Sequence, residues 1–344
     1  MNTTVVTLND VAREAGVSLA TASRVLNGSA RRVADSYRER VEEAAARLGY
    51  TANLSAQATA RGTAAIVALL VSDIADPYFG QIAAGVAKAA DEAGLVVTIA
   101  VTDRSPDREA RHLHALRGQR PRGLILASTR TTAAAASSEL ESELAALAAL
   151  GTRVVAVGRG APSLRTVPVD NHAGTRALGL ALAGRGYRRA VVLAAQPGLI
   201  SSDDRVDGFS SGFGAGGGEV LRIHRGAYTW EAGHQAMTEA LAAGIEPGTL
   251  VFAASDIAAI GAMAAIRAAG RSVGDDIALA GFDDVQTSRD VTPALTTVRV
   301  PLEEIGYLAL RAVTDRDWQP PATPPGFQVL LRESTPGLPP SGKP

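Results

Sequence analysis

Residues 18–27 of this 344-residue sequence, SLATASRVLN, combine side chains that can contact the edges of DNA bases. Arg24 carries the planar donor group that pairs with O6 and N7 of guanine, and Leu19 and Ala20 offer apolar contacts for thymine methyl groups. The apolar residues between them recur at helical spacing, and an α-helix fits the major groove of B-DNA. The stretch therefore has the composition of a helix that reads double-stranded DNA.

Other polar side chains of the same stretch fit contacts to the DNA backbone. Ser18 and Thr21, with the N-terminus of the helix, could hold phosphates, which sets register without carrying sequence information. Ser23 and Asn27 also point away from the expected inner face. A plainer alternative is that Ser18 only caps the helix and Arg24 is only a solvated arginine. For an isolated pair of helices, that alternative is favoured.

Helix signals surround this stretch closely. Thr7 and Asp10 have the spacing of a capping box at the start of a first helix, and Gly16 suits a left-handed stop after it. We expect helices over residues 8–15, 19–26 and 35–48. The third helix is expected to turn inward Tyr37, Val41, Ala44, Ala45 and Leu48. Two short helices joined by a glycine-containing turn, with a third in support, form a helix-turn-helix.

The longer run VTLNDVAREAGVSLATASRVLNG, residues 6–28, resembles the head of the LacI/GalR family of transcriptional regulators at nearly every position. The match is ungapped and specific, and it departs at Ala22, where the family usually has valine. The resemblance implies a repressor that binds an operator. In it, Leu19, Ala20 and Arg24 take the places that read bases.

The segment YTANLSAQATARG, which begins at Tyr50, resembles the hinge of the same family more loosely. Asn53 and Ala56 fit the pattern, but Thr59 stands where the family has a leucine that wedges into the minor groove. Because an apolar wedge separates base steps best, we expect either weaker kinking of the operator or an operator without the usual central step. One residue more than the family pattern lies around positions 30–32. The residues expected at the DNA are Thr7, Ser18, Leu19, Ala20, Thr21, Ser23, Arg24, Asn27, Arg32, Asn53, Ala56 and Thr59.

From Ala64 onward, short apolar runs alternate with helical patterns, which is typical of doubly wound α/β layers with parallel sheets. Strands are expected over 66–71, 96–101, 123–127, 153–157, 190–194, 250–253 and 277–280. Helices are expected near 79–93, 107–117, 139–150, 172–183, 204–213, 231–243 and 257–269. A ligand of such a fold belongs at the carboxyl ends of the strands, in the crevice between two lobes.

The expected fold is therefore α/β: a small all-α helix-turn-helix head and a two-lobed, doubly wound sensor domain, which the family resemblance makes periplasmic-binding-protein-like. We expect the head and hinge at 1–62, the effector-binding and dimerisation domain at 63–335 and a flexible tail at 336–344. The first lobe is expected over about 63–160 and 293–320, and the second over about 161–292 and 321–335.

Looser family motifs recur along this second region, among them DPYF from Asp76 and GFDD from Gly281. The residues that the resemblance implies at an effector pocket are Tyr78, Phe79, Arg159, Arg205, Tyr228, Ser255 and Asp283. Aromatic faces suit the C–H surface of a sugar, and charged planar groups suit its paired hydroxyls. Taken singly, each residue has a structural alternative: the tyrosines as core or rim aromatics, Asp283 as a turn cap. Asp256 is expected to be such a cap.

The effector class stays partly open. Where many relatives have a glutamine before a proline, this chain has Val300-Pro301, and Gly158 stands where some sugar-binding members have an aspartate. A sugar is favoured, and a purine or nucleoside remains an alternative. The resemblance leaves open whether the effector induces or co-represses. It implies a homodimer whose two recognition helices read a near-palindromic operator.

Composition narrows the remaining classes. The chain has no cysteine, which excludes a disulfide framework and a cysteine zinc site, and no cofactor or other metal is expected. The N-terminus lacks the pattern of a signal peptide and no run is long enough to span a membrane, so a cytoplasmic protein without a membrane partner is expected. A solute-binding protein without direct operator binding is the alternative. An enzyme is disfavoured, because the Gly-Phe-Ser-Ser-Gly string at 208–212 falls within a helical pattern.

Overall fold

The computed structural model describes residues 6–27, 33–50, 64–127, 138–160, 164–321 and 323–338. The chain forms two compact units, Met1–Ala65 and Ile66–Pro344, which are treated separately below. Within the described ranges, no helix has the length and apolar character needed to cross a membrane.

The first unit consists, in its described part, of the helices α1 (Leu8–Ala15), α2 (Leu19–Asn27) and α3 (Asp35–Leu48). The predicted capping box is confirmed: Thr7 accepts a hydrogen bond from the amide of Asp10, whose carboxylate accepts from the Thr7 amide. The helices bury a small common core of Val11, Ala12, Ala15, Ala22, Val41, Ala44 and Ala45.

A side chain of α3 holds the turn between α1 and α2 in place. Gly16 ends α1 in the left-handed conformation, with φ of 62°, as predicted. The guanidinium of Arg40 donates to the carbonyl of Ala15, which satisfies a free carbonyl at the end of α1. Tyr37 was predicted to point inward but is 46% exposed, with the Arg40 guanidinium 5.9 Å from its ring centre. An amphipathic phenol can keep its hydroxyl in water while its ring face packs under a cation.

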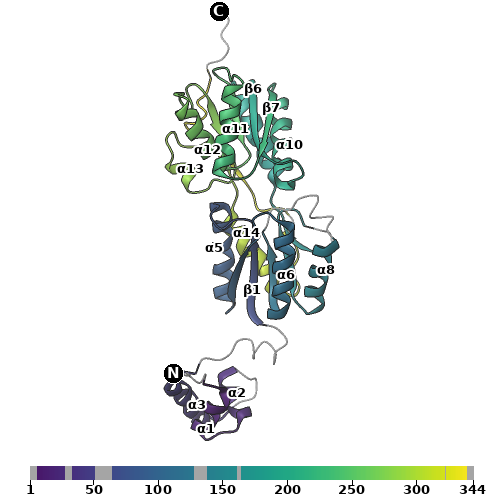
Figure 1. The fold of residues 1–344 in the computed structure, drawn as a ribbon, viewed down its shortest axis with the longest axis vertical. Coiled ribbons are helices and arrows are strands. Elements are labelled where there is room, and N and C mark those ends of the chain that lie inside the picture. The colour runs from purple at the N-terminus through teal and green to yellow at the C-terminus, as the bar shows by residue number, and fades with distance from the viewer. Residues whose placement is uncertain are drawn as a thin grey trace, which may run out of the picture. The chain divides into compact units, whose positions relative to one another are not determined.

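The second unit begins with a sheet of strand order β2-β1-β3-β4-β5. Its strands are β1 (Ala64–Val71), β2 (Val96–Val101), β3 (Pro121–Leu126), β4 (Arg153–Val157) and β5 (Arg165–Val167). The helices of this first lobe are α5 (Pro77–Glu92), α6 (Pro106–Gln119), α8 (Ser138–Ala149) and α14 (Leu302–Thr314). Helix α5 packs with α14 and α6 packs with α8, and α5 and α6 flank β1 in Figure 1.

The second lobe repeats this plan with a parallel sheet of order β7-β6-β8-β9. Its strands are β6 (Arg189–Ala195), β7 (Glu219–Gly226), β8 (Leu250–Ala253) and β9 (Ala278–Ala280). Its helices are α9 (Asn171–Gly184), α10 (Ile200–Ala215), α11 (Trp230–Ala242), α12 (Asp256–Ala268) and α13 (Thr287–Asp290). Helix α9 packs with α10. Helix α11 packs with α12, and the two lie side by side in Figure 1.

The chain passes between the lobes after β5, after β10 (Thr297–Arg299) and again before β11 (Gln328–Leu330). Strands β10 and β11 pair antiparallel and lie against α9, in the second lobe, whereas α14 between them packs on the first sheet. The expected lobe limits differ here, because 165–167 pair with β4 and 297–299 pair with β11. Strands of three residues are too short to leave an alternating pattern.

The ordered, packed part of the chain continues beyond residue 335, where a flexible tail was expected to begin. The hydroxyl of Tyr187 donates to the carbonyl of Pro336 over 2.6 Å, and the amide of Leu338 donates to the carbonyl of Arg185 over 2.9 Å. Residues 336–338 therefore belong to the packed second lobe, although the proline-rich composition predicted a tail from 336 onward.

Glycines let α9 and α10 pack with their backbones in contact. A Cβ on Gly208 would overlap the carbonyl of His172, and a Cβ on Gly212 would overlap the carbonyl of Arg176. Both glycines belong to the Gly-Phe-Ser-Ser-Gly string, which lies inside α10 as predicted. The string therefore serves helix packing and lacks the strand-to-helix turn of a nucleophile elbow.

The same device joins α5 to α14. A Cβ on Gly85 would overlap the carbonyl of Glu303, and a Cβ on Gly306 would overlap the carbonyl of Ile82. Because neither contact leaves room for a methyl group, α14 is locked to α5 even though more than 200 residues separate them in the sequence.

Candidate functional site

A cavity of about 290 Å³ lies between the carboxyl ends of the two parallel sheets. Both lobes line it, as expected for doubly wound sheets. All of the residues that the sequence placed at an effector pocket contribute to its wall: Tyr78, Phe79, Arg159, Arg205, Tyr228, Ser255 and Asp283. The geometry brings them together, and their contact with an effector stays a prediction.

Arg205 and Asp283 form a buried ion pair in the wall of this cavity. Nη2 of Arg205 donates to Oδ1 of Asp283 over 2.9 Å, and Nη1 donates to Oδ2 over 3.3 Å. Nε donates to Asn171 over 2.8 Å, and Nη1 also donates to the carbonyl of Ala254 over 2.7 Å. A guanidinium held by this many acceptors has a fixed orientation.

Burial would lower the pKa of Arg205, but the adjacent carboxylate of Asp283 raises it, so Arg205 stays charged. For Asp283, burial raises the pKa of the carboxyl and the guanidinium opposes that rise. The pair is therefore a fixed dipole in a poorly hydrated wall, able to exchange hydrogen bonds with the hydroxyls of a ligand.

Aromatic rings surround the same guanidinium. Its central carbon lies 4.1 Å from the ring centre of Phe282, 5.6 Å from that of Tyr228 and 6.0 Å from that of Tyr78. Phe79 meets Tyr78 edge to face at 5.0 Å. Burial raises the pKa of both tyrosines, which keeps their hydroxyls neutral. Ring faces beside a charged planar group are suited to a ligand with both C–H and hydroxyl surfaces.

The cap of helix α12 is Ser255 and not Asp256, which the sequence had predicted for that role. Ser255 is the N-cap of α12 and accepts a hydrogen bond from the amide of Ala258. Asp256, predicted as a cap, is fully buried and accepts from the amide of Val285 over 3.0 Å and from the hydroxyl of Thr297 over 2.6 Å. Burial raises the pKa of Asp256 to about 7. Its carboxyl therefore ties α12 to the segment after β9 and does not cap a helix.

The first lobe reaches across the cavity through arginines. Nη2 of Arg104 donates to the backbone carbonyl of Tyr228 over 3.0 Å. Arg159 donates to the carboxylate of Asp204 over 2.8 Å. Each contact joins one lobe to the other, so each depends on how far the lobes are closed.

Several buried polar atoms at the cavity have no hydrogen-bond partner among the described residues. They are Nε of Arg104, the hydroxyl of Ser201 and the hydroxyl of Tyr228. A buried donor or acceptor without a partner is costly. The cavity therefore offers hydrogen-bonding groups from both lobes to a polar ligand or to ordered water.

Sequence reasoning missed other residues of the wall: Asp76, Arg104, Asn171, Ser201 and Asp204. Asp76 and Arg104 follow β1 and β2, so the rule that ligands bind beyond the carboxyl ends of strands could have found them. Ser201 lies one helical turn before Arg205, and helical spacing places both on one face of α10. No group of three or more His, Asp or Glu side chains in the described ranges could hold a metal ion.

In the head, most of the residues expected to contact DNA from helix α2 are exposed to solvent. Ser18, Leu19, Ala20 and Arg24 are exposed, and Thr21 and Ser23 are half-buried. The hydroxyl of Ser18 accepts from the amide of Thr21, which caps α2. The side chain of Asn27 lies outside the described residues, and so do the predicted contacts Arg32, Asn53, Ala56 and Thr59.

Thr7 has a structural role that accounts for its presence. Its hydroxyl donates to Oδ2 of Asp10 over 2.7 Å, within the capping box, and its side chain is exposed. Hydrogen bonding with Thr7 lowers the pKa of Asp10. Contact of Thr7 with DNA therefore stays a prediction that must be compatible with this cap.

Known proteins resemble the chain along nearly its whole length. The family model for bacterial regulatory proteins of the lacI family matches residues 7–53, and that for a periplasmic binding protein-like domain matches residues 180–335. The transcriptional regulator CelR of Thermobifida fusca is 32% identical, over 90% of this chain and 91% of its own length. The regulator GalR of Escherichia coli is 31% identical, over 96% and 97%.

Solved structures agree. A Lac repressor dimer bound to operator and the anti-inducer ONPF superposes with a TM-score of 0.81 at 27% identity, covering 97% of this chain and 100% of that one. A complex of CelR with cellobiose gives 0.68 at 30% identity, over 96% and 99%. The helix-turn-helix head, the parallel two-lobed sensor and these matches together show that the chain is a DNA-binding transcriptional regulator and belongs to the lacI family of bacterial regulatory proteins.

Proposed function

We propose that this chain is a repressor whose affinity for a near-palindromic operator is set by a sugar bound between the two lobes. The observation that supports this most directly is the buried Arg205–Asp283 pair, flanked by Tyr78 and Tyr228, at a cavity that still has polar atoms without partners. Paired hydroxyls can bridge the guanidinium and the carboxylate, and a pyranose face can lie against the rings.

The size and charge of the cavity favour a neutral ligand. Its volume of about 290 Å³ accommodates a mono- or disaccharide. Two arginines of the wall are paired with carboxylates, Arg205 with Asp283 and Arg159 with Asp204. An anion at either of these two arginines would have to displace its carboxylate. Cellobiose, which the relative CelR binds, is therefore the first sugar to test, and a nucleoside is the alternative ligand.

The head carries the output in this proposal. Two copies of the chain form a dimer, as in the Lac repressor dimer, and place their α2 helices in successive major grooves. Leu19, Ala20 and Arg24 contact bases, while Ser18 and Thr21 contact phosphates. The head and hinge extend to residue 62, and the sensor extends from 63 to 338, because residues 336–338 pack on the second lobe. As a DNA-binding regulator that binds its effector without transforming it, the protein acts in the cytoplasm.

The experiment that tests this is selection of DNA from a random pool with the full-length protein, followed by titration of the selected duplex by fluorescence anisotropy. Cellobiose, galactose, ribose and adenosine are added in turn. We expect a near-palindrome whose affinity changes with one of the sugars. A response to adenosine alone would replace the sugar by a nucleoside. A failure to select any sequence would contradict operator binding.

A matched pair of variants tests which helix of the head contacts the bases. Arg24→Ala on α2 and Arg38→Ala on α3 remove the same charge from exposed positions. Because a bidentate arginine–guanine pair contributes about 1–3 kcal/mol of discrimination, Arg24→Ala should relax sequence preference at one base pair of each half-site. Arg38→Ala should leave the preference intact. The same loss of preference in both variants would contradict the role of α2.

A further inference from the structure

The segment after β9 that carries Asp283 has an unusual backbone. Asp283 has φ of 118° and its neighbour Asp284 has φ of 56°, both in the left-handed half of conformational space. Side chains with a Cβ adopt this conformation at a cost in energy, and such strain persists only where surrounding contacts hold it. Two consecutive residues of this kind, one of them facing the cavity, need contacts that hold the backbone in this conformation.

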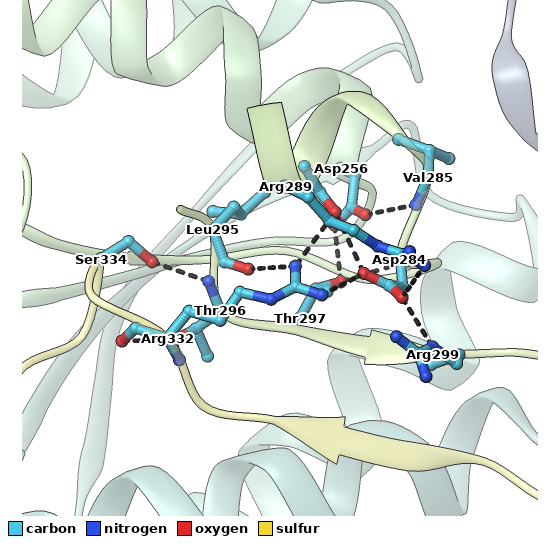
Figure 2. A network of polar contacts seen from close by, with 11 residues as sticks. Asp256, Asp284, Val285, Arg289, Leu295, Thr296, Thr297, Arg299, Arg332 and Ser334 are labelled. Atoms are coloured by element: carbon cyan, nitrogen blue, oxygen red, sulfur yellow. Dashed lines mark hydrogen bonds and ion pairs between the residues drawn. The ribbon is translucent and has the colours of Figure 1, made fainter. Parts of the chain in front are cut away.

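The restraint is visible on the other side of the segment. The carboxylate of Asp284 is fully buried and accepts from Nη2 of Arg289 over 2.9 Å, from Nε of Arg299 over 2.7 Å and from Nη2 of Arg332 over 2.5 Å (Figure 2). The hydroxyl of Ser288 donates to the same carboxylate over 3.1 Å. The guanidinium groups come from α13, from β10 and from the residues after β11. They lower the pKa of Asp284 against the effect of burial, so it is ionised at neutral pH.

The backbone of the segment is tied on both sides of Asp284. The amide of Asp283 donates to the carbonyl of Val298 over 2.9 Å, and the amide of Val285 donates to Asp256 over 3.0 Å. The bond to Val298 fixes the segment to β10, where Arg299 also lies. Within this arrangement the side chains of Asp283 and Asp284 point to opposite partners, one to Arg205 and the other to the arginine cluster.

We propose that Asp284 is a positioning residue for effector recognition: its ion pairs hold Asp283 in the strained conformation that directs the Asp283 carboxylate to Arg205 at the cavity. Asp284 itself does not contact the cavity and acts through its neighbour. A turn cap needs one or two donors, whereas Asp284 gathers charged donors from segments spread over more than 40 residues. The effect on the conformation of Asp283 stands by itself, and the effect on ligand affinity rests on the proposed function.

The first test needs no ligand. A crystal structure of the full-length Asp284→Asn variant should show Asp283 outside the left-handed region and its carboxylate beyond hydrogen-bonding distance of Nη2 of Arg205, now 2.9 Å. An unchanged ion pair would overturn the proposal. If Asp284→Asn does not fold, Arg299→Gln removes one half-exposed partner and should shift Asp283 in the same direction. Glu246→Gln, which breaks an exposed pair with Arg189 elsewhere in the second lobe, is the control and should leave Asp283 in place.

The second test separates positioning from general stability. Cellobiose binding is measured by calorimetry for the wild type, Asp284→Asn, Asp283→Asn and the double variant, as a double-mutant cycle. Asp284→Asn should weaken binding at least about tenfold in the wild-type background and less than about twofold when Asp283 is already asparagine. Equal losses in both backgrounds would overturn a role through Asp283. If the wild type binds none of the sugars, the proposed function fails, and the crystal structure still decides the positioning role.

Discussion

The two walls of the cavity are built on different principles. The second-lobe wall centres on Arg205 and Asp283, both almost fully buried and joined by two hydrogen bonds. The first-lobe wall presents Arg104, whose nearest carboxylates lie 3.9 and 4.0 Å away, and Arg159, whose side chain is 66% exposed. The second-lobe wall, here called the rigid wall, is therefore held by contacts within its own lobe. The first-lobe wall, here called the adjustable wall, has weaker ion pairs within its lobe, and its shortest hydrogen bonds go to the second lobe.

This difference shows which wall is preorganised for a ligand. A preorganised pair loses little freedom on binding, so the second lobe provides the fixed half of the site. The arginines of the first lobe reach partners on the second lobe, namely Asp204 and the carbonyl of Tyr228. Because these two contacts join the lobes, they favour this arrangement over any arrangement in which the lobes lie further apart.

The largest effect should come from breaking the rigid wall. Arg205→Met leaves the buried Asp283 carboxylate without its cation and also frees acceptors on Asn171 and Ala254. Removal of one partner of a buried pair costs about 3–5 kcal/mol, so the free energy of unfolding should fall by that amount. Urea unfolding of the sensor transition measures it. A loss below about 1 kcal/mol would show that this pair is no more rigid than a surface pair.

The second lobe, which carries the rigid wall, should also show a pH dependence of its stability. Asp256 has a pKa of about 7 in the folded protein, whereas an aspartate in an unfolded chain titrates near about 4. The folded state binds this proton more tightly, so the stabilisation is complete at low pH and is lost as pH rises from about 4 to about 7, by up to about 1.4 kcal/mol per pH unit. Asp256→Asn should make the fall in the free energy of unfolding between about pH 4 and about pH 7 less steep.

Glu246→Gln, a change at an exposed ion pair of the same lobe, should keep the wild-type slope. Identical profiles for the wild type and Asp256→Asn would contradict the assignment of the titration to Asp256.

The adjustable wall should affect affinity more than stability. Arg104→Gln removes the hydrogen bond to the carbonyl of Tyr228 that joins the lobes. One charged hydrogen bond favouring the closed state corresponds to about a tenfold loss of effector affinity, with a change in unfolding free energy below about 1 kcal/mol. Calorimetry and urea unfolding give the two values. A stability loss as large as that of Arg205→Met would erase the distinction between the walls.

The smallest effect should come from Arg159→Met, which makes the same substitution as in Arg205→Met at an exposed ion pair. Because solvent screens the pair with Asp204, the unfolding free energy should change by less than about 1 kcal/mol. Any change in effector affinity should shrink further in about 0.5 M salt, where the Debye length is short. An effect that persists in high salt would place Arg159 with the rigid wall.

Much of the cavity wall could be predicted from the sequence, because residue types on both lobes carry the signal. The family resemblance placed Arg205 and Asp283 together although 78 residues separate them. Tyr78 follows a proline-initiated helix start after a buried strand, and Asp76 caps that helix. Apolar runs for β1 and β8 and periodic patterns for α5 and α12 also lie within a few residues of their predicted limits. Buried strands and amphipathic helices leave strong patterns in a sequence.

Other features of the fold and the site could not be predicted from the sequence, for physical reasons. The contact of Arg104 ends on a backbone carbonyl, which every residue type possesses. Strand β7 is exposed along much of its length, so it has no apolar run to detect, and β10 and β11 are only three residues long. Ser255 and Asp256 are both good caps, and only tertiary contacts with Val285 and Thr297 decide between them.

The glycine-mediated locking of α14 to α5 has a mechanical consequence. Helix α14 lies between two passages of the chain from one lobe to the other, and α5 begins at the residues that form the adjustable wall. Since no side chain separates the two helices at Gly85 and Gly306, there is no compressible layer to absorb a displacement. A displacement of α5 would therefore have to move α14 with it. Such a displacement would reach the two segments that join the lobes, because both continue from the ends of α14.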